Sequence, residues 1–196
     1  MNPLTALPDP DRATMQRLHA RLVEAAAADD TLDLVYRTVD TPLGSLLLAA
    51  TPAGLVRVAY ESQDHDAVLA TLADRISPRV LRAPARLDTV ARELDDYFAG
   101  RRHTFELPLD LQLAHGFRRE VLTHLRDIGY GSTASYAVVA AATGRPKAVR
   151  AVGTACAVNP LPIVIPCHRV VRSDGSTGAY VGGVPAKQTL LDLEAA

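Results

Sequence analysis

Short β-rich runs, separated by turn residues, organise the chain between residues 34 and 60. Residues 34–39, 45–50 and 55–60 are rich in Leu, Val and Tyr, and side chains of this kind favour strands. Thr41-Pro42-Leu43-Gly44 and Pro52-Ala53-Gly54 contain the proline and glycine of tight turns. Three short strands joined in this way predict a small antiparallel sheet.

Apolar residues at helical spacing predict helices on both sides of these strands. Asp11 can cap a helix whose apolar positions share one face, namely Met15, Leu18, Leu22 and Val23. Residues 1–33 are therefore expected to form an N-terminal helical extension. After the strands, residues 66–76 and the apolar stripe of residues 87–98 predict two further helices, and Gly100 suits the end of the second.

The second half of the chain is predicted to consist of helices and loops. Apolar residues at positions 117, 121, 122 and 125 share one helical face, and Ser135 can cap a helix that runs to Ala142. Gly144 suits a left-handed helix end, and Pro146 suits the first turn of a following helix that runs to Ala157. Two short helices joined in this way match a helix-turn-helix unit. An ordinary corner between two helices has the same spacing, so the pattern leaves both open.

Pro108 marks a boundary between these two kinds of pattern. After the N-terminal extension, residues 34–110 are expected to form one domain, which contains the small antiparallel sheet. Residues 111–196 are expected to form a second, mostly helical domain. The chain is therefore predicted to be an α+β protein with two domains.

Charge and cysteine content narrow the class of protein. Residues 1–100 carry 10 basic and 15 acidic side chains and residues 101–196 carry 11 and 7, so the halves have net charges of -5 and +4. A basic half attracts polyanions, of which nucleic acid is the commonest, although such a charge is also usual for a solvated surface. Two cysteines, Cys156 and Cys167, make no disulfide framework and indicate a reducing compartment. The sequence shows no secretory signal and no membrane span, so the cytoplasm is the expected location.

Cys167 and His168 are the strongest candidates for covalent chemistry. A thiol becomes a good nucleophile when it loses its proton, and a nearby imidazole can remove that proton. Pro160, Pro162 and Pro166 bracket an apolar stretch that is expected to be stiff and buried, with Cys167 at its end. Adjacent side chains on an extended segment point to opposite sides, so contact between the two residues needs a bend or a water. Taken alone, a cysteine is more often a small core residue than a nucleophile.

Several motifs in a fixed order carry a specific resemblance. They are Arg150-Ala151-Val152-Gly153, Asn159-Pro160, Pro166-Cys167-His168-Arg169-Val170, Gly178-Ala179-Tyr180-Val181-Gly182-Gly183 and Leu190-Leu191-Asp192-Leu193-Glu194. This pattern resembles the O6-alkylguanine-DNA alkyltransferases, or methylated-DNA–protein-cysteine methyltransferases, without gaps from about Gly131 to Glu194. Residues 41–44 and 95–100 resemble the family more loosely. The resemblance implies a ribonuclease-H-like N-terminal domain and a C-terminal domain with a winged-helix-like helix-turn-helix.

The resemblance implies roles for five residues in the reaction. Cys167 would attack the alkyl carbon on O6 of guanine in an in-line displacement. His168 would take the thiol proton through a water, and Glu194 would orient His168, which is the logic of an activated nucleophile. Asn159 would tie the recognition helix to the active-site segment, and Tyr136 would support the leaving guanine at N3.

Other residues are assigned by the resemblance to the DNA and to the base pocket. The damaged nucleotide lies inside a duplex and must be flipped out, and the planar guanidinium of Arg150 would fill the gap in the stack. The recognition helix would lie in the minor groove, where contacts discriminate bases poorly. The small residues Ala151 and Gly153 would let this helix approach closely. The pocket wall would comprise Pro162, Tyr180, Val181, Gly182 and Lys187.

The chain departs from the family's usual pattern at several positions. Ala157 stands where a basic residue often follows the recognition helix, which removes a possible phosphate contact. Arg118 and Leu122 stand where a glutamine and a tryptophan are frequent, and Ala179 replaces a more usual asparagine or glycine. Some members bind zinc in the N-terminal domain, but this N-terminal half has no cysteine, so we expect no zinc.

The function implied is direct reversal of DNA damage. The alkyl group of O6-alkylguanine, and weakly that of O4-alkylthymine, would pass from double-stranded DNA to Cys167 in a single irreversible turnover. The protein is expected to act as a monomer, without a metal or an organic cofactor. A non-catalytic damage sensor of the same fold is the second hypothesis, but such proteins carry another residue in place of the cysteine. A thiol hydrolase is the third, and Arg150 with Tyr136 disfavours it because that class needs an oxyanion hole rather than a DNA-reading helix.

Overall fold

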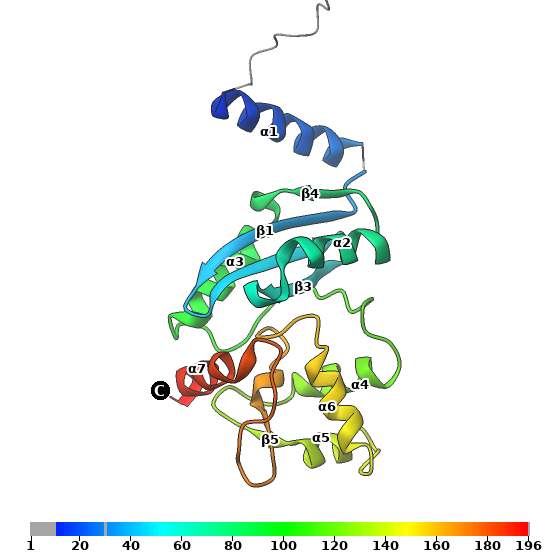
Figure 1. The fold of residues 1–196 in the computed structure, drawn as a ribbon, viewed down its shortest axis with the longest axis vertical. Coiled ribbons are helices and arrows are strands. Elements are labelled where there is room, and N and C mark those ends of the chain that lie inside the picture. The colour runs from blue at the N-terminus through cyan, green and yellow to red at the C-terminus, as the bar shows by residue number, and fades with distance from the viewer. Residues whose placement is uncertain (1–10, 30, 196) are drawn as a thin grey trace, which may run out of the picture.

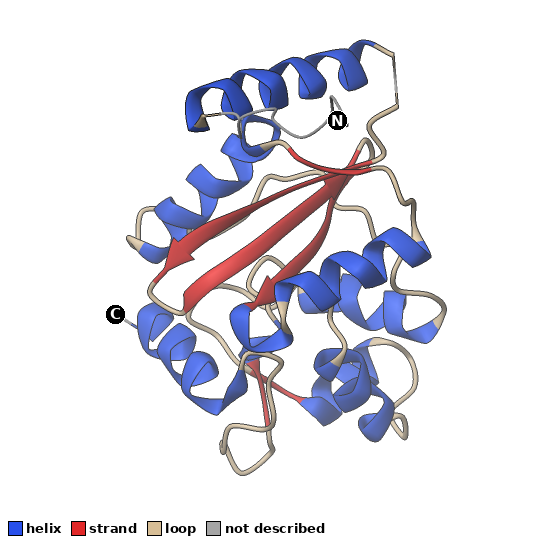
Figure 2. Cartoon of the chain, turned by 45° about the horizontal axis from the view of Figure 1, so that its top comes forward, coloured by secondary structure: helices blue, strands red, loops and turns tan. Residues whose placement is uncertain are grey.

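A four-stranded sheet and a group of short helices make up the computed structural model, which describes residues 11–29 and 31–195. Figure 1 shows the sheet of the first half lying against the helices of the second half, with the C-terminal helix α7 (Gly183–Ala195) between them. Figure 2 shows the three long strands side by side with helices around them. The α+β class predicted from the sequence is confirmed.

The sheet contains the predicted meander and one strand more. Strands β1 (Leu34–Thr41), β2 (Gly44–Thr51) and β3 (Gly54–Tyr60) pair antiparallel, as their patterns predict. Strand β4 (Val80–Arg82) pairs parallel with β1, so the strand order is β3-β2-β1-β4 and the sheet is mixed. Strand β4 was not predicted, because three residues are too few to establish a period of two.

Each face of the sheet packs against a helix, and the alternation of side chains along β2 shows how. Leu46 and Leu48 belong to the core that includes α3 (Asp88–Phe98), whereas Leu47 and Ala49 belong to the core that includes α2 (His65–Arg75). All four side chains are buried, because the period of two sends neighbours to opposite faces and both faces are covered. Short 3₁₀ turns, η1 (Glu61–Gln63) and η2 (Pro84–Leu87), precede the two helices.

The outer edge of β3 joins the two halves of the chain. Leu55 exchanges backbone hydrogen bonds with the connecting segment, donating to Pro108 O at 2.8 Å and accepting from Asp110 N at 2.9 Å. A Cβ on Gly54 would lie 2.3 Å from Pro108 O, so the close approach requires glycine. Further along the strand, Val58 N donates to Pro160 O at 2.8 Å. The strand edge therefore holds both the segment that links the halves and the segment that leads to Cys167.

The second half contains the three predicted helices and a C-terminal helix, α7, that was not predicted. They are α4 (Phe117–Leu125), α5 (Tyr136–Ala142), α6 (Val149–Ala157) and α7, with a two-stranded parallel pair, β5 (Ala134–Ser135) and β6 (Val170–Val171). Ser135 caps α5 by accepting from Val138 N at 3.2 Å, as expected. Helix α6 begins at Val149 rather than at Pro146, because a turn closed by Ala148 N and Arg145 O at 2.8 Å precedes it.

The N-terminal extension contains the predicted helix α1 (Arg12–Ala28). Asp11 caps it by accepting from Thr14 N at 2.7 Å. The side chain of Val23 packs against the core, whereas Met15, Leu18 and Leu22 are about half exposed. Residues 1–10 and residue 30 lie outside the described part of the chain. Within that part, no helix combines the length and the apolar character needed to cross a membrane.

Candidate active site

A buried segment delivers Cys167 to the centre of the second half. Every residue from 159 to 171 is buried, as the proline-bracketed apolar stretch predicts. Ile163 has a φ of +74°, a left-handed conformation that is costly for a β-branched side chain. Such backbone persists where the surroundings hold it, and here Ile165 N donates to Leu161 O at 2.8 Å across the bend. The bend places Cys167 at the start of a 3₁₀ turn, η3 (Cys167–Arg169).

Asn159 connects the end of α6 to this segment. Its carbonyl oxygen Oδ1 accepts from Leu161 N at 3.0 Å. Its amide Nδ2 donates to Ile165 O at 2.9 Å and to Cys167 Sγ at 3.1 Å. Asn159 is fully buried, and both the oxygen and the nitrogen of its amide form hydrogen bonds. It therefore fixes the position of the Cys167 sulfur relative to α6. This is the connection between the helix and the active-site segment that the resemblance implies for Asn159.

The Cys167 thiol is protonated at neutral pH. Burial raises its pKa to about 11, although the Asn159 N–H and the positive charge of Lys187 favour the thiolate. The second thiol, Cys156 on α6, is also free and buried, and burial raises its pKa to about 12. Neither sulfur is therefore a nucleophile at rest, and Cys167 needs a base that removes its proton.

His168 has the properties of that base. Its side chain is fully buried, and its Nε2 lies 2.9 Å from Glu194 Oε1 on α7. Burial lowers the pKa of His168 despite the nearby carboxylate, so the ring is neutral at pH 7. Because the carboxylate accepts, Nε2 carries the ring hydrogen and Nδ1 is the basic nitrogen. Nδ1 is buried and has no hydrogen-bond partner among the residues that the structure describes.

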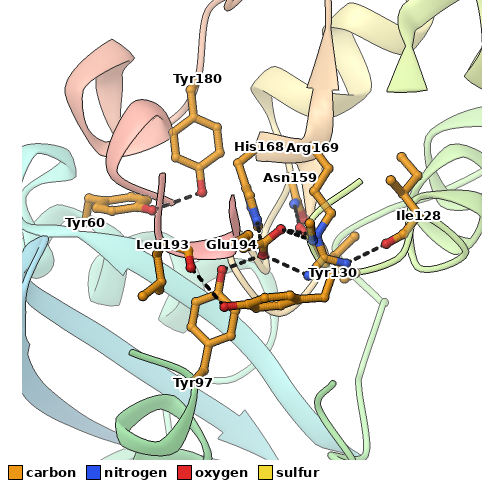
Figure 3. A network of polar contacts seen from close by, with 12 residues as sticks. Tyr60, Tyr97, Ile128, Tyr130, Asn159, His168, Arg169, Tyr180, Leu193 and Glu194 are labelled. Carbon is orange, nitrogen blue, oxygen red and sulfur yellow. Dashed lines mark hydrogen bonds and ion pairs between the residues drawn. The ribbon is translucent and has the colours of Figure 1, made fainter. Parts of the chain in front are cut away.

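Glu194 is the centre of a network that joins three segments of the chain (Figure 3). Arg169 donates from Nε to Oε2 and from Nη2 to Oε1, both at 2.8 Å, and Tyr97 donates to Oε1 at 2.7 Å. Burial opposes ionisation, but the hydrogen bonds from His168 and Arg169 lower the pKa of Glu194 to about 2. The carboxylate is thus ionised, and its buried charge is paired with the buried guanidinium of Arg169.

Arg169 and Tyr97 were not among the predicted site residues. Both lie inside motifs that carry the family resemblance, and that position is the one feature of the sequence that could have indicated them. Tyr97 lies 97 positions before Glu194, and no local pattern indicates that the two side chains meet.

Two tyrosines form the side of the site next to the sheet. Tyr180 and Tyr60, the last residue of β3, have their hydroxyl oxygens 3.0 Å apart. The ring of Tyr180 meets that of His168 edge-on at 6.3 Å between centroids. A Cβ on Gly182 would lie 2.5 Å from the Tyr60 ring, so only glycine fits there. Two of the residues expected on the pocket wall, Tyr180 and Gly182, are therefore close to His168 or to Tyr60.

Tyr136 lies between the loop before α7 and helix α6. A Cβ on Gly178 would lie 2.5 Å from the Tyr136 hydroxyl, and one on Gly153 would lie 3.9 Å from its ring. Burial raises the pKa of Tyr136, and the neighbouring sulfurs Cys156 and Cys167 raise it further. Tyr136 is thus a neutral hydrogen-bond donor near the sulfur of Cys167.

The remaining expected site residues differ in their exposure. Arg150 and Ala151 are exposed on α6, and Val181 is half-buried. Pro162 is buried within the bent segment. The side chain of Lys187 is fully buried, and its Nζ donates to Val170 O at 2.5 Å. Among the described residues, no three His, Cys, Asp or Glu side chains converge as metal ligands.

Comparisons with known proteins match both halves of the chain. The family model described as "6-O-methylguanine DNA methyltransferase, ribonuclease-like domain" matches residues 34–111, and that described as "6-O-methylguanine DNA methyltransferase, DNA binding domain" matches residues 116–196. The ribonuclease-like character expected of the first half is therefore confirmed.

Among the similar relatives is a methylated-DNA–protein-cysteine methyltransferase from Mycolicibacterium paratuberculosis. It is 39% identical over 159 residues, covering 81% of this chain and 91% of the relative. The constitutive methylated-DNA–protein-cysteine methyltransferase of Bacillus subtilis is 38% identical, covering 81% and 94%. A crystal structure of Mycobacterium tuberculosis OGT in complex with DNA superposes with a TM-score of 0.70 at 35% identity, covering 82% of this chain and 92% of that one.

Proposed function

The chain belongs to the 6-O-methylguanine DNA methyltransferase family, and we propose that it repairs O6-alkylguanine in DNA by moving the alkyl group onto Cys167. One observation carries the assignment of the acceptor. Cys167 is held by Asn159 at the end of α6, beside a neutral His168 whose free ring nitrogen is buried. This is the arrangement of a thiol with its own base and orienting acid.

The reaction begins with loss of the thiol proton. No direct hydrogen bond joins Cys167 to His168 in the described part of the structure, so we propose that a water carries the proton from Sγ to Nδ1. The Asn159 N–H stabilises the thiolate as it forms. Glu194, which already accepts from Nε2, stabilises the imidazolium that results.

The thiolate then displaces guanine from the alkyl carbon. A bond forms between Sγ and that carbon while the bond from carbon to O6 breaks, and the electron pair stays on the guanine. The Tyr136 hydroxyl supports the leaving base by donating to N3. The thioether on Cys167 is stable, so each molecule acts once and no metal or organic cofactor is required.

DNA recognition is proposed for α5 and α6, with α6 as the recognition helix of a helix-turn-helix in residues 111–196. The exposed Arg150 lies in the first turn of α6, where its guanidinium can fill the gap left by a flipped nucleotide. The exposed Ala151 and the half-buried Gly153 allow a close approach to the minor groove. We propose a monomer that acts on double-stranded DNA in the cytoplasm, with residues 34–110 as a separate sheet domain.

Mass spectrometry tests the acceptor directly. Wild-type protein, Cys167→Ala and Cys156→Ala are mixed with a duplex that contains O6-methylguanine. We expect the mass of one added methyl group, mapped to Cys167, in the wild type and in Cys156→Ala. Cys167→Ala should gain none. Folded wild-type protein without an adduct, or an adduct on Cys156, would contradict the proposal.

A further inference from the structure

A cleft of about 380 Å³ lies between the sheet domain and the end of α6. Arg57 on β3 and Arg75 at the end of α2 line it from the sheet domain. Ala157 and Val158, at the C-terminal end of α6, line it from the other side. Asn159 and Val181 also line it, so the cleft adjoins the active site, but it contains no residue of the network around Glu194, and the reaction described above does not use its arginines.

The two arginines bring positive charge into the cleft without a balancing carboxylate. Within the described part of the chain, neither guanidinium has a hydrogen bond or an ion pair, and no Asp or Glu lines the cleft. Other arginines of the same domain are paired, such as Arg37 with Asp88 at 2.6 Å and Arg79 with Asp33 at 2.7 Å. Two neighbouring cations without an anion are unfavourable, and the cost rises as they leave water.

Burial distinguishes Arg57 from an ordinary surface arginine. Its side chain is partly buried, and this burial, together with the positive charge of Arg75, lowers the pKa of Arg57. A partly desolvated guanidinium interacts more strongly with an anion than one in water does. The planar fork of arginine also matches the oxygens of a phosphate group, which favours phosphate over a single-atom anion.

The position of the cleft indicates which phosphate it would meet. Helix α6 has 9 residues, which at a rise of about 1.5 Å per residue separates its ends by about 13 Å. A duplex carries one charge per about 1.7 Å of its axis, so DNA lying along α6 brings phosphates to both ends of the helix. Ala157 offers no charge at the far end, and Arg57 and Arg75 face the same cleft.

We propose that this cleft binds a phosphodiester of the DNA backbone through Arg57 and Arg75, at the opposite end of α6 from Arg150. The inference rests on the proposed function, since it assumes that α6 faces DNA. The sheet domain thereby takes part in DNA binding and supplies the charge that Ala157 lacks.

A matched pair of double variants tests the cleft. Arg57→Gln/Arg75→Gln removes the two cleft charges, and Arg86→Gln/Arg92→Gln removes two exposed arginines elsewhere on the sheet domain. Binding of a fluorescent undamaged duplex is measured by anisotropy over a range of salt. We expect the cleft variant to bind at least about tenfold more weakly than the control, since it loses two charged contacts to phosphate. The number of counterions released on binding, given by the slope of the affinity against salt, should fall by up to about two.

Two further readouts separate this inference from the proposed function. Methyl transfer from free O6-methylguanine base should be equal in both variants and the wild type, because a base without a backbone cannot use the cleft. Absence of transfer in the wild type would count against the proposed function, and the binding data would still decide the role of the cleft. Equal DNA affinity in the two variants would overturn the inference. So would saturable binding of inorganic phosphate to the cleft that duplex DNA does not displace, since it would make the cleft a site for the free ion.

Discussion

Tyr97, on α3 of the sheet domain, donates a hydrogen bond of 2.7 Å to Glu194 Oε1, on the last helix of the chain. Tyr97 is fully buried, and its burial and the neighbouring carboxylate raise the pKa of its hydroxyl, so the tyrosine is always the donor. The same oxygen accepts from His168 and Arg169. Helix α3, which packs on the sheet, therefore reaches the carboxylate that accepts from His168.

Replacing Tyr97 with phenylalanine should destabilise the protein. The change removes one donor to a buried carboxylate, and hydrogen bonds to charged groups contribute about 1.5–3 kcal/mol. We expect the free energy of unfolding in urea to fall by about 2 kcal/mol, with slower methyl transfer. Tyr130→Phe is the control, because Tyr130 donates to a neutral carbonyl, Leu193 O, and is only half-buried. If the free energy of unfolding fell equally in the two variants, the bond to Glu194 would contribute no more stability than the bond to a neutral carbonyl.

Acid should destabilise the fold through Glu194. Its pKa falls from an ordinary 4.5 to about 2 on folding, so the ionised carboxylate contributes stability above pH 4.5. That contribution, of the order of 3 kcal/mol, is lost as the pH falls through about 2. The lowered pKa of His168 also makes the free energy of unfolding fall as the pH falls. The histidine of the unfolded chain takes up its proton at a higher pH than the buried one does. We expect the wild-type free energy of unfolding to decline over this range more steeply than that of Glu194→Gln. Parallel pH profiles would contradict the assignment.

The pH dependence of methyl transfer should reveal His168 as the base. The wild-type rate should be nearly constant around neutral pH, because His168 is already neutral and removes the thiol proton itself. In His168→Gln the thiolate must form unaided, and the pKa of Cys167 is about 11. The rate of this variant should be low at pH 7 and rise about tenfold per pH unit towards pH 9.5 with free O6-methylguanine base. A flat profile for His168→Gln would exclude His168 as the base.

Arg150 should affect the repair of duplex DNA but not the methyl-transfer step itself. Its side chain is exposed at the start of α6, away from the buried network. We expect Arg150→Ala to repair O6-methylguanine in a duplex at least about tenfold more slowly, since a stacked, hydrogen-bonded guanidinium is lost. Transfer from the free base should be unchanged. Equal losses on both substrates would instead indicate a structural role for Arg150.

The sequence by itself determined the local elements and the centre of the site. The strands over residues 34–60, the caps at Asp11 and Ser135 and the helix end at Gly100 were predictable, because each depends on neighbours within a few positions. Cys167 was recognisable for a different reason, because several motifs between Arg150 and Glu194 occur in a fixed order along the chain. The start of α6 at Val149 and the short strand β4 were missed, since a turn at Pro146 and a three-residue strand leave no periodic pattern.

Only the tertiary structure decided which distant groups meet. The contact of Tyr97 with Glu194, the burial of Lys187 against Val170 O and the cleft between Arg57 and Arg75 join segments that are far apart in the chain or on different elements. Such pairings have no local signature, because packing of the whole chain sets them. The protonation of His168 and Glu194 depends on that packing too, since burial and partners, not residue type, shift a pKa.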